Sequence, residues 1–334
     1  MTAIPALPKI ELHLHLDCCL SYNAVRALDP AVTEAAYRRD FIAPERCSSL
    51  ADYLRYPPRS VALLQNADAL QLAVDDLFEQ LAQDRVLYAE IRFAPFLHTT
   101  GGLQAHQVVE IVDRATTLAI ARTGIDVRLI LCTLRHFDAD SSLQTARLVT
   151  GFRGTQVVAI DIAGDEAGYP LAPHVPAFEM VYENEMAITA HAGEALGPAS
   201  VWQTLEKLRP GRLGHGVRSI EDSRLVAHLA ASRIHLEVCP TSNLQTGVSP
   251  DLSAHPIHRL HQAHVSLGIS TDTRTISDIT LNQEYANIER AFHWTAADFL
   301  ACNLNALVAA FIPPDVRQVL SARLIEGYNA DRMV

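Results

Sequence analysis

Eight short apolar runs rich in β-branched residues recur along this chain, and they constrain its fold more strongly than any other feature. Most of them are continuous rather than alternating, as is typical of parallel strands that are covered on both faces. We therefore interpret each run as a strand of a largely parallel sheet. The predicted strands cover residues 10–16, 86–93, 127–132, 157–162, 187–190, 212–214, 234–238 and 265–271.

Amphipathic segments fill the gaps between these runs. Residues 69–84, 107–123 and 200–208 carry apolar side chains at the spacing of a helix. Eight strands with intervening helices predict an α/β fold of the (β/α)8 TIM-barrel type, with a doubly wound sheet as the alternative. Segment 20–70 is predicted to be a helical insertion that partly covers the barrel mouth. Because no repeat or linker divides the chain, we expect residues 1–334 to form a single domain.

The composition narrows the class of partner. The formal net charge of −11 argues against a nucleic-acid or anionic-membrane surface. No stretch approaches the ~18–20 uninterrupted apolar residues of a membrane span, and the first residues lack the basic and apolar regions of a secretory signal. The six cysteines form no CxxC pair, so no zinc knuckle is indicated. We expect a soluble, cytoplasmic protein with free thiols, and the sequence leaves its oligomeric state open.

Polar residues gather at the C-terminal ends of the predicted strands. His13 and His15 lie two positions apart in the first strand, so their side chains point to one face. Barrel enzymes place their chemistry at this end of the barrel. Packing alone does not explain such a cluster, because buried imidazoles and carboxylates without partners cost several kcal/mol. The residues concerned are His13, His15, His191, Glu194, His215 and Asp272.

A shared metal ion removes that cost. Three neutral imidazoles and one carboxylate suit Zn²⁺, and Fe²⁺ or Co²⁺ can substitute in the same ligand set. Such a metal lowers the pKa of a bound water towards ~7 and makes hydroxide available at neutral pH. Glu194 and His215 are then left over, and both are residue types that transfer protons. The predicted ligands are His13, His15, His191 and Asp272.

In their order and strand positions, these motifs resemble those of the adenosine deaminases, a family of the metal-dependent amidohydrolase superfamily. The resemblance extends along nearly the whole chain, and it implies a (β/α)8 barrel with one zinc ion. It also implies hydrolytic deamination at C6 of a 6-aminopurine nucleoside, which releases ammonia. The matching stretches are "ELHLHLD" (11–17), "YAEIRFAP" (88–95), "DIAGDEAG" (161–168), "TAHAGE" (189–194), "RLGHG" (212–216), "EVCPTSN" (237–243) and "STD" (270–272).

The same resemblance implies residue roles. Glu194 matches the proton donor that meets purine N1, and His215 matches the residue that activates and orients the attacking water. Asp272 matches a metal ligand that also accepts a hydrogen bond from that water. The backbone N–H of Gly164 is placed at purine N3, and Asp17 at the ribose 5′-hydroxyl. The implied substrate-binding residues are His15, Asp17, Gly164 and Thr273.

The lysines bear on the number of metal ions. Two-metal relatives in the superfamily bridge their metals with a carboxylated lysine at a strand end. The lysines of this chain are Lys9, before the first predicted strand, and Lys207, inside a helical segment. Neither position suits a bridging ligand, so we expect one metal ion per chain.

Two positions depart from the family pattern. Thr273 stands where many members have a second Asp that contacts purine N7. Its hydroxyl can donate to that acceptor, directly or through a bridging water. Cys18 stands where Gly is common, and with Cys19 it either lines the pocket or fills space.

Arg274 follows the first of these positions and has two interpretations. It binds a phosphate or another anionic substituent of the substrate, or it forms an ion pair with Asp278 or Glu284, which are close in sequence. We favour the ion pair.

The predicted function is zinc-dependent deamination of adenosine and 2′-deoxyadenosine. The closest alternative is the same chemistry on adenine or an aminofutalosine-type nucleoside. Asp17 favours a nucleoside over bare adenine, because an unpaired pocket carboxylate penalises a ligand that lacks the 5′-hydroxyl. An alternative of another class, a catalytically silent purine-binding protein, is disfavoured by the intact Glu194, His215 and ligand set. The expected partner is a small-molecule purine nucleoside, with neither nucleic acid nor membrane.

Overall fold

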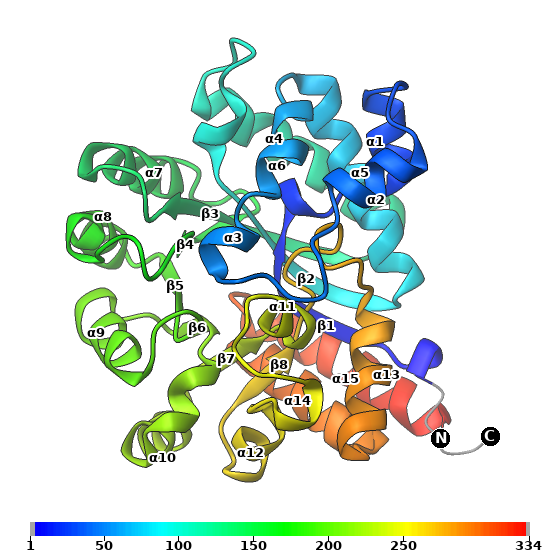
Figure 1. Ribbon diagram of the computed structural model, residues 1–334, viewed down its shortest axis with the longest axis vertical. Coiled ribbons are helices and arrows are strands. Elements are labelled where there is room, and N and C mark those ends of the chain that lie inside the picture. The colour runs from blue at the N-terminus through cyan, green and yellow to red at the C-terminus, as the bar shows by residue number, and fades with distance from the viewer. Residues whose placement is uncertain (1–3, 332–334) are drawn as a thin grey trace.

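Eight parallel strands form the centre of the computed structural model, which describes residues 4–331 (Figure 1). Each strand pairs with its neighbour in the sequence. β1 also meets the segment after β8, because the amide of His15 donates to the carbonyl of Asp272 at 2.8 Å and the amide of Asp272 donates to the carbonyl of His13 at 2.9 Å. This seam closes the sheet into a barrel. The strands are β1 (Lys9–His15), β2 (Val86–Phe93), β3 (Asp126–Leu134), β4 (Val157–Ala163), β5 (Ala187–Ala192), β6 (Arg212–His215), β7 (His235–Val238) and β8 (Leu267–Ile269).

Helices connect the strands and cover the outside of the barrel (Figure 1). The predicted (β/α)8 fold is therefore confirmed, and the doubly wound alternative is excluded because the strand order never reverses. The prediction of a single domain stays a prediction. α5 (Ala67–Gln83) precedes β2. The helices that follow β2 are α6 (Ala105–Thr123), α7 (Ala139–Gly151), α8 (Val175–Glu183), α9 (Pro198–Leu208), α10 (Ser223–Ser232), α11 (Pro240–Gln245), α12 (Ile257–Gln262), α13 (Leu281–Phe292), α14 (Ala296–Ala309) and α15 (Pro314–Asp331).

Each predicted strand begins and ends within two residues of the observed one. The last strand is shorter than predicted at both ends, with residues 267–269 in place of 265–271. Its C-terminal end is set by the turn that follows, where Asp272 adopts a left-handed backbone conformation with φ of 64°. That turn brings Asp272 back against β1.

Four short helices lie between β1 and α5. Side chains at their starts accept backbone N–H groups three residues on, as Ser21 does for α1, Thr33 for α2 and Ser49 for α3. Figure 1 shows α3 and α4 over the barrel opening, and residues of both line the cavity described below. The helices are α1 (Tyr22–Leu28), α2 (Glu34–Asp40), α3 (Leu50–Tyr53) and α4 (Pro57–Leu63).

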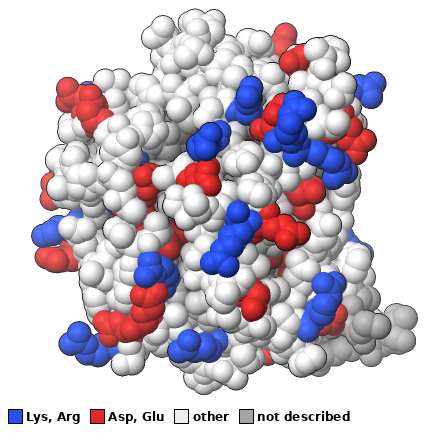
Figure 2. Space-filling view, viewed as in Figure 1, with Lys and Arg blue, Asp and Glu red and all other residues white. Residues whose placement is uncertain are grey.

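The charged side chains on the face in view are of both signs. Figure 2 shows acidic and basic side chains interspersed across this face, without a continuous basic patch. Within residues 4–331 no helix is long and apolar enough to cross a membrane. The cytoplasmic location stays a prediction.

Glu284 is a buried acid outside the barrel opening. It lies in α13, is fully buried, and one carboxylate oxygen accepts the backbone N–H of Thr241 at 2.9 Å. The other oxygen has no hydrogen-bond partner among the described residues. Burial therefore raises the pKa of Glu284 to about 8. The folded protein thus binds a proton at this site at pH values where the unfolded chain has released it.

We predict that Glu284→Gln is more stable than the wild type, by a margin in unfolding free energy that grows as the pH rises. Between the unfolded pKa near 4.5 and the folded value near 8, the wild type loses roughly 1 kcal/mol of stability per pH unit relative to the variant. The glutamine keeps an acceptor for Thr241 but has no charge to bury. Denaturant unfolding at pH 5 and pH 8 measures the difference. Glu79→Gln, on the exposed side of α5, should behave as wild type, and a pH-independent difference for Glu284→Gln would contradict the prediction.

Candidate active site

A cavity of about 680 Å³ opens at the C-terminal ends of the strands. Residues that follow β1, β4, β5, β6 and β8 form one side of it, and α3 and α4 form part of its roof. Among the predicted site residues, His13 is fully buried beneath the floor. All the others line the cavity: His15, Asp17, Gly164, His191, Glu194, His215, Asp272 and Thr273.

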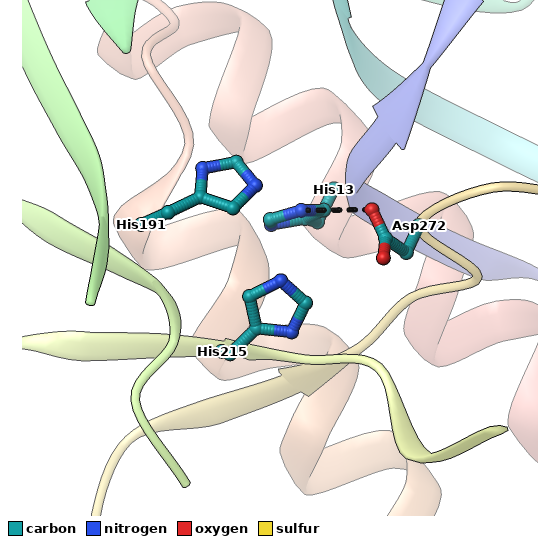
Figure 3. A group of neighbouring side chains, drawn as sticks. All are labelled: His13, His191, His215 and Asp272. Atoms are coloured by element: carbon teal, nitrogen blue, oxygen red, sulfur yellow. Dashed lines mark ion pairs between the residues drawn. The ribbon is translucent and has the colours of Figure 1, made fainter. Parts of the chain in front are cut away.

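Four side chains meet at the floor of this cavity (Figure 3). His13, His191, His215 and Asp272 each offer one atom, and these atoms all lie within 4.8 Å of one another. His15 also belongs to the group, because its Nε2 lies 3.3 Å from Nε2 of His191 and 3.3 Å from Oδ1 of Asp272. Nε2 of His13 lies 3.3 Å from the same carboxylate oxygen. Five donor groups from β1, β5, β6 and the β8 loop therefore converge.

Backbone geometry places these side chains. His13 and His15 alternate with buried leucines along β1, so both rings face inward. His215, the last residue of β6, and Asp272 both have left-handed backbones, with φ of 58° and 64°. Residues other than glycine rarely adopt this conformation. Here it turns both side chains toward the cluster.

A buried ion network lies directly under the cluster. Nδ1 of His13 is 2.8 Å from Glu237, and Nδ1 of His191 is 3.0 Å from Asp161. Arg92 bridges the two carboxylates at 2.7 Å to Asp161 and 2.6 Å to Glu237. Because carboxylates only accept hydrogen bonds, each Nδ1 carries a proton, and in its neutral form each ring presents the lone pair of Nε2 to the cluster. Sequence reasoning missed all three charged residues, although each interrupts an apolar strand.

The protonation states of the cluster suit a cation. Burial lowers the pKa of His191 and lowers that of His15 to about 3, so both rings are neutral. Although burial opposes ionisation of Asp272, its contacts with His13 hold its pKa well below the usual range. Nε2 of His13 is buried and has no hydrogen-bond partner among the described residues. An orphaned nitrogen beside two neutral imidazoles and a carboxylate fits a divalent metal ion.

His215 differs from the other three imidazoles. The backbone N–H of Ile257 donates to Nδ1 of His255, so Nε2 of His255 carries the proton and donates to Oδ1 of Asn243 at 3.2 Å. The amide nitrogen of Asn243 then donates to Nδ1 of His215 at 3.1 Å. Since burial also lowers the pKa of His215 strongly, the ring is neutral with its proton on Nε2. That proton faces Glu194, whose Oε2 lies 3.5 Å from Nε2 of His215.

Glu194 stands at the cavity wall as a neutral acid. Burial raises its pKa well above the usual value, and the nearby charges of Asp272 and Glu166 add to the effect. The loop that carries it is fixed by Glu166, which is also buried. Carboxylate oxygens of Glu166 accept the backbone N–H groups of Gly193, Glu194, Ala195 and Leu196 and the hydroxyl of Ser200.

Thr273 belongs to a group of three buried hydroxyls. Tyr53 from α3 hydrogen-bonds to Thr273 and lies 3.0 Å from the hydroxyl of Ser277, which is 3.2 Å from that of Thr273. Tyr53 and Thr273 both line the cavity. No sequence pattern indicated that Tyr53 is next to Thr273, because the two are separated by 220 positions and the contact depends on the path of the inserted segment.

Asp17 lies beside two other side chains, and its role at the ribose 5′-hydroxyl stays a prediction. Its Oδ2 lies 3.4 Å from Nε2 of His98, and the Cys18 thiol donates to Oδ1 at 3.7 Å. Nδ1 of His98 donates to the carbonyl of Leu64 at 3.0 Å. Burial works against ionisation of Asp17, yet the contact with His98 lowers its pKa below the usual value. A ligand without a 5′-hydroxyl therefore leaves this carboxylate in contact with His98 and Cys18.

Arg274 serves the fold, and both sequence interpretations of it were wrong in detail. It is buried and forms ion pairs with Glu11 at 2.6 Å and Asp84 at 2.7 Å, rather than with Asp278, Glu284 or a ligand. These partners are distant in sequence, so its spacing to nearby acids was uninformative.

The two neighbouring cysteines are both buried, and Cys18 lines the cavity. Burial raises the pKa of both thiols. Because the thiolate is the reactive form, neither cysteine is poised for nucleophilic chemistry.

Comparison with known proteins agrees with this geometry. The family model for adenosine deaminase matches residues 8–327. An adenosine deaminase from Mycolicibacterium gilvum is 38% identical, over 91% of this chain and 90% of the relative. A zinc-bound amidohydrolase from Burkholderia ambifaria superposes with a TM-score of 0.91 at 22% identity, covering 99% and 94% of the two chains. The N6-mAMP deaminase of Arabidopsis gives 0.87 at 25% identity, covering 97% and 99%.

The family match and the 38% identity to the Mycolicibacterium relative place the chain among hydrolases of the amidohydrolase type. The chain belongs to the adenosine deaminase family and is an enzyme.

We predict that Asp161→Asn weakens metal binding about 10- to 100-fold. The amide is a poorer acceptor for Nδ1–H of His191 and a poorer partner for Arg92, so the ligating ring is less basic and less firmly oriented. Zinc affinity measured by competition with a chromogenic chelator tests this. Asp126→Asn is the control, because Asp126 begins β3 at the end of the strand that is away from the cavity. Equal zinc affinity in all three proteins would show that Asp161 does not act through His191.

Proposed function

We propose that this enzyme hydrolytically deaminates adenosine and 2′-deoxyadenosine to inosine and 2′-deoxyinosine. Water adds to purine C6, the bond from C6 to the exocyclic nitrogen breaks, and that nitrogen leaves as ammonia after taking a proton. The observation that carries the proposal is the neutral, buried acid Glu194 beside the Nε2–H of His215, above a cluster of metal-type donors. Membership of the adenosine deaminase family supports the same reaction.

One zinc ion per chain is the proposed cofactor. When bound, it supplies a water of lowered pKa as the nucleophile. Its proposed ligands are His13, His15, His191 and Asp272. His215 is left out because both of its nitrogens are committed, Nδ1 to Asn243 and Nε2 to the proton that faces Glu194. The zinc ion bound in the Burkholderia structure supports the choice of metal.

A single metal is also supported by the lysines. Nζ of Lys9 donates to the carbonyls of Ile4, Leu7 and Asp84 at the opposite end of β1 from His15. Lys207 is exposed in α9 and pairs with Glu206. Neither side chain reaches the cluster as a bridging ligand.

Three residues of the chain manage protons and charge. As water adds to C6, negative charge develops at N1, and the neutral carboxyl of Glu194 donates its proton there. Nε2–H of His215 donates a hydrogen bond to the attacking oxygen and orients it. Asp272 accepts a hydrogen bond from the same oxygen, while its other oxygen accepts the hydroxyl of Ser242 at 2.7 Å.

The remaining contacts orient the purine and the sugar. The backbone N–H of Gly164 is proposed to meet N3, while His15 and Asp17 lie on the sugar side. One of the hydroxyl protons shared by Thr273 and Tyr53 is directed to N7, so a carboxylic acid is not needed at this position.

A substrate panel tests the proposal. Zinc-loaded protein is incubated with adenosine, 2′-deoxyadenosine, adenine and AMP, and loss of the 6-aminopurine absorbance is followed. Adenosine and its 2′-deoxy form should have the highest kcat/KM. A preference for adenine would favour the alternative of a base deaminase. A preference for an aminofutalosine-type nucleoside, tested in the same way, would favour that substrate. No turnover of any compound with zinc bound would support the silent purine-binding protein.

We predict that Glu194→Gln lowers kcat by about 10²- to 10⁴-fold, because glutamine has no acidic proton to give to N1. Zinc content and the affinity for inosine should stay close to those of the wild type, since the amide has the same shape. Stopped-flow assays, metal analysis and calorimetry provide the three readouts. Glu206→Gln, an exposed change of the same kind in α9, should leave all three unchanged. A near-normal kcat for Glu194→Gln would rule out its role as proton donor.

A further inference from the structure

The cavity extends well beyond its chemical centre. A volume of about 680 Å³ lies in the range that encloses drug-sized ligands, which are larger than a nucleoside. The reactive side chains occupy the side formed by the ends of β1, β5, β6 and β8. The opposite wall is formed by α4 and the short helix η3 (Pro95–His98). Apolar side chains line this wall: Pro57, Pro58, Val61, Phe96 and Leu97.

This apolar wall begins where the sugar is expected. α4 packs against η3 and also against η2 (Leu16–Cys18), the turn that carries Asp17. His98 of η3 contacts the Asp17 carboxylate directly. A nucleoside whose sugar lies against Asp17 therefore directs its 5′ position along α4.

The polar atoms in the wall are used internally. Nε2 of Gln65 donates to the carbonyls of Val61 at 2.6 Å and Leu97 at 3.0 Å. Its Oε1 accepts both the amide and the hydroxyl of Thr100. Gln65 thus links the end of α4 to η3 and offers the ligand no free donor or acceptor. The wall is rigid and apolar.

Aromatic rings continue the wall to the mouth of the cavity. Phe96, His136 and Tyr169 line the cavity, and Phe137 lies behind them in edge-to-face contact with Phe96 and His136. The ring of His136 also meets that of Tyr169 edge-to-face, with centroids 6.2 Å apart. Tyr169 is 44% exposed and lines the cavity, so part of its side chain is accessible at the mouth.

The charges around the cavity are of one sign. Its described lining contains no lysine or arginine, whereas the carboxylates of Asp17, Asp165 and Asp272 border it. A 5′-phosphate near Asp17 would meet a carboxylate and no basic side chain of the lining, which disfavours nucleotides. Without the 5′-hydroxyl, Asp17 keeps its contacts with His98 and the Cys18 thiol.

We infer that the wall of α4 and η3 is a subsite for an uncharged, apolar 5′-substituent, and that 5′-deoxy-5′-(alkylthio)adenosines are substrates. The inference rests on the proposed function, since the reaction at C6 is the same. Water replaces the 6-amino group, ammonia leaves, and the thioether bond is not touched.

Substrates of increasing length test the subsite. Zinc-loaded enzyme is assayed with adenosine, its 5′-methylthio and 5′-butylthio derivatives, and AMP, and calorimetry measures the binding of each. Each added methylene should raise kcat/KM about fourfold while it is buried against the wall. AMP should be at least about 100-fold poorer than adenosine. Turnover of adenosine with no gain from methylthio to butylthio, or turnover of AMP at the rate of adenosine, overturns the subsite.

The two proposals fail in different ways. If no nucleoside is deaminated, the proposed function fails, and the calorimetric comparison of the two thioethers still decides the subsite. Tighter binding of the butylthio compound supports it, and equal or weaker binding overturns it.

Matched variants on α4 locate the effect. Val61→Asp should lower the ratio of kcat/KM for the butylthio compound to kcat/KM for adenosine at least tenfold. Val61→Thr is nearly isosteric and should lower the same ratio severalfold. It provides the test if the aspartate variant does not fold. Arg59→Gln changes the net charge by the same amount at an exposed position of the same helix outside the cavity lining, and it should leave the ratio unchanged. Equal ratios in wild type and both Val61 variants overturn the assignment.

Discussion

A buried ion network centred on Arg92 fixes the geometry on which the rest of the site depends. Its guanidinium contacts Asp161 and Glu237, and each of these carboxylates accepts the Nδ1–H of a histidine in the cluster. Removing one charge from such a network leaves the others buried and unpaired, which costs far more than the net stabilisation the network provides. The orientation of the imidazoles is therefore set from below the cavity, before any ligand binds.

Hydrogen-bond direction divides the histidines into two functional groups. Where a carboxylate lies behind the ring, as for His13 and His191, the lone pair points into the cavity and is available to a cation. Where an amide donor lies behind it, as for His215, the proton points into the cavity instead. These three histidines thus present either a lone pair or a proton to the cavity according to the group that contacts Nδ1, and the neutral acid Glu194 lies beside them.

Local patterns predicted the barrel and the polar residues at its strand ends, because parallel strands bring the residues after them to one end. The resemblance to the family, rather than any pattern, added Asp17, Gly164 and Thr273. The ion network was harder to predict from the sequence. Arg92, Asp161 and Glu237 were visible as charges inside apolar runs, a sign of pairing. Which charge pairs with which depends on strand register, so Arg274 was matched with acids near in sequence although its partners are Glu11 and Asp84. The contacts of Tyr53 and His98 depend on the path of loops, which periodicity does not encode.

Asp272 joins the chemistry to the closure of the barrel. Its side chain belongs to the cluster, and its backbone N–H and carbonyl form hydrogen bonds to His13 and His15 of β1, across the seam. A cation at the proposed site would be held by Asp272 together with the histidines of β1, and it would cross-link the first strand to the segment that follows the last one. Separation of those strands would then require release of the cation. On this proposal, the lifetime of the folded barrel depends on the occupancy of its metal site as well as on contacts within the protein.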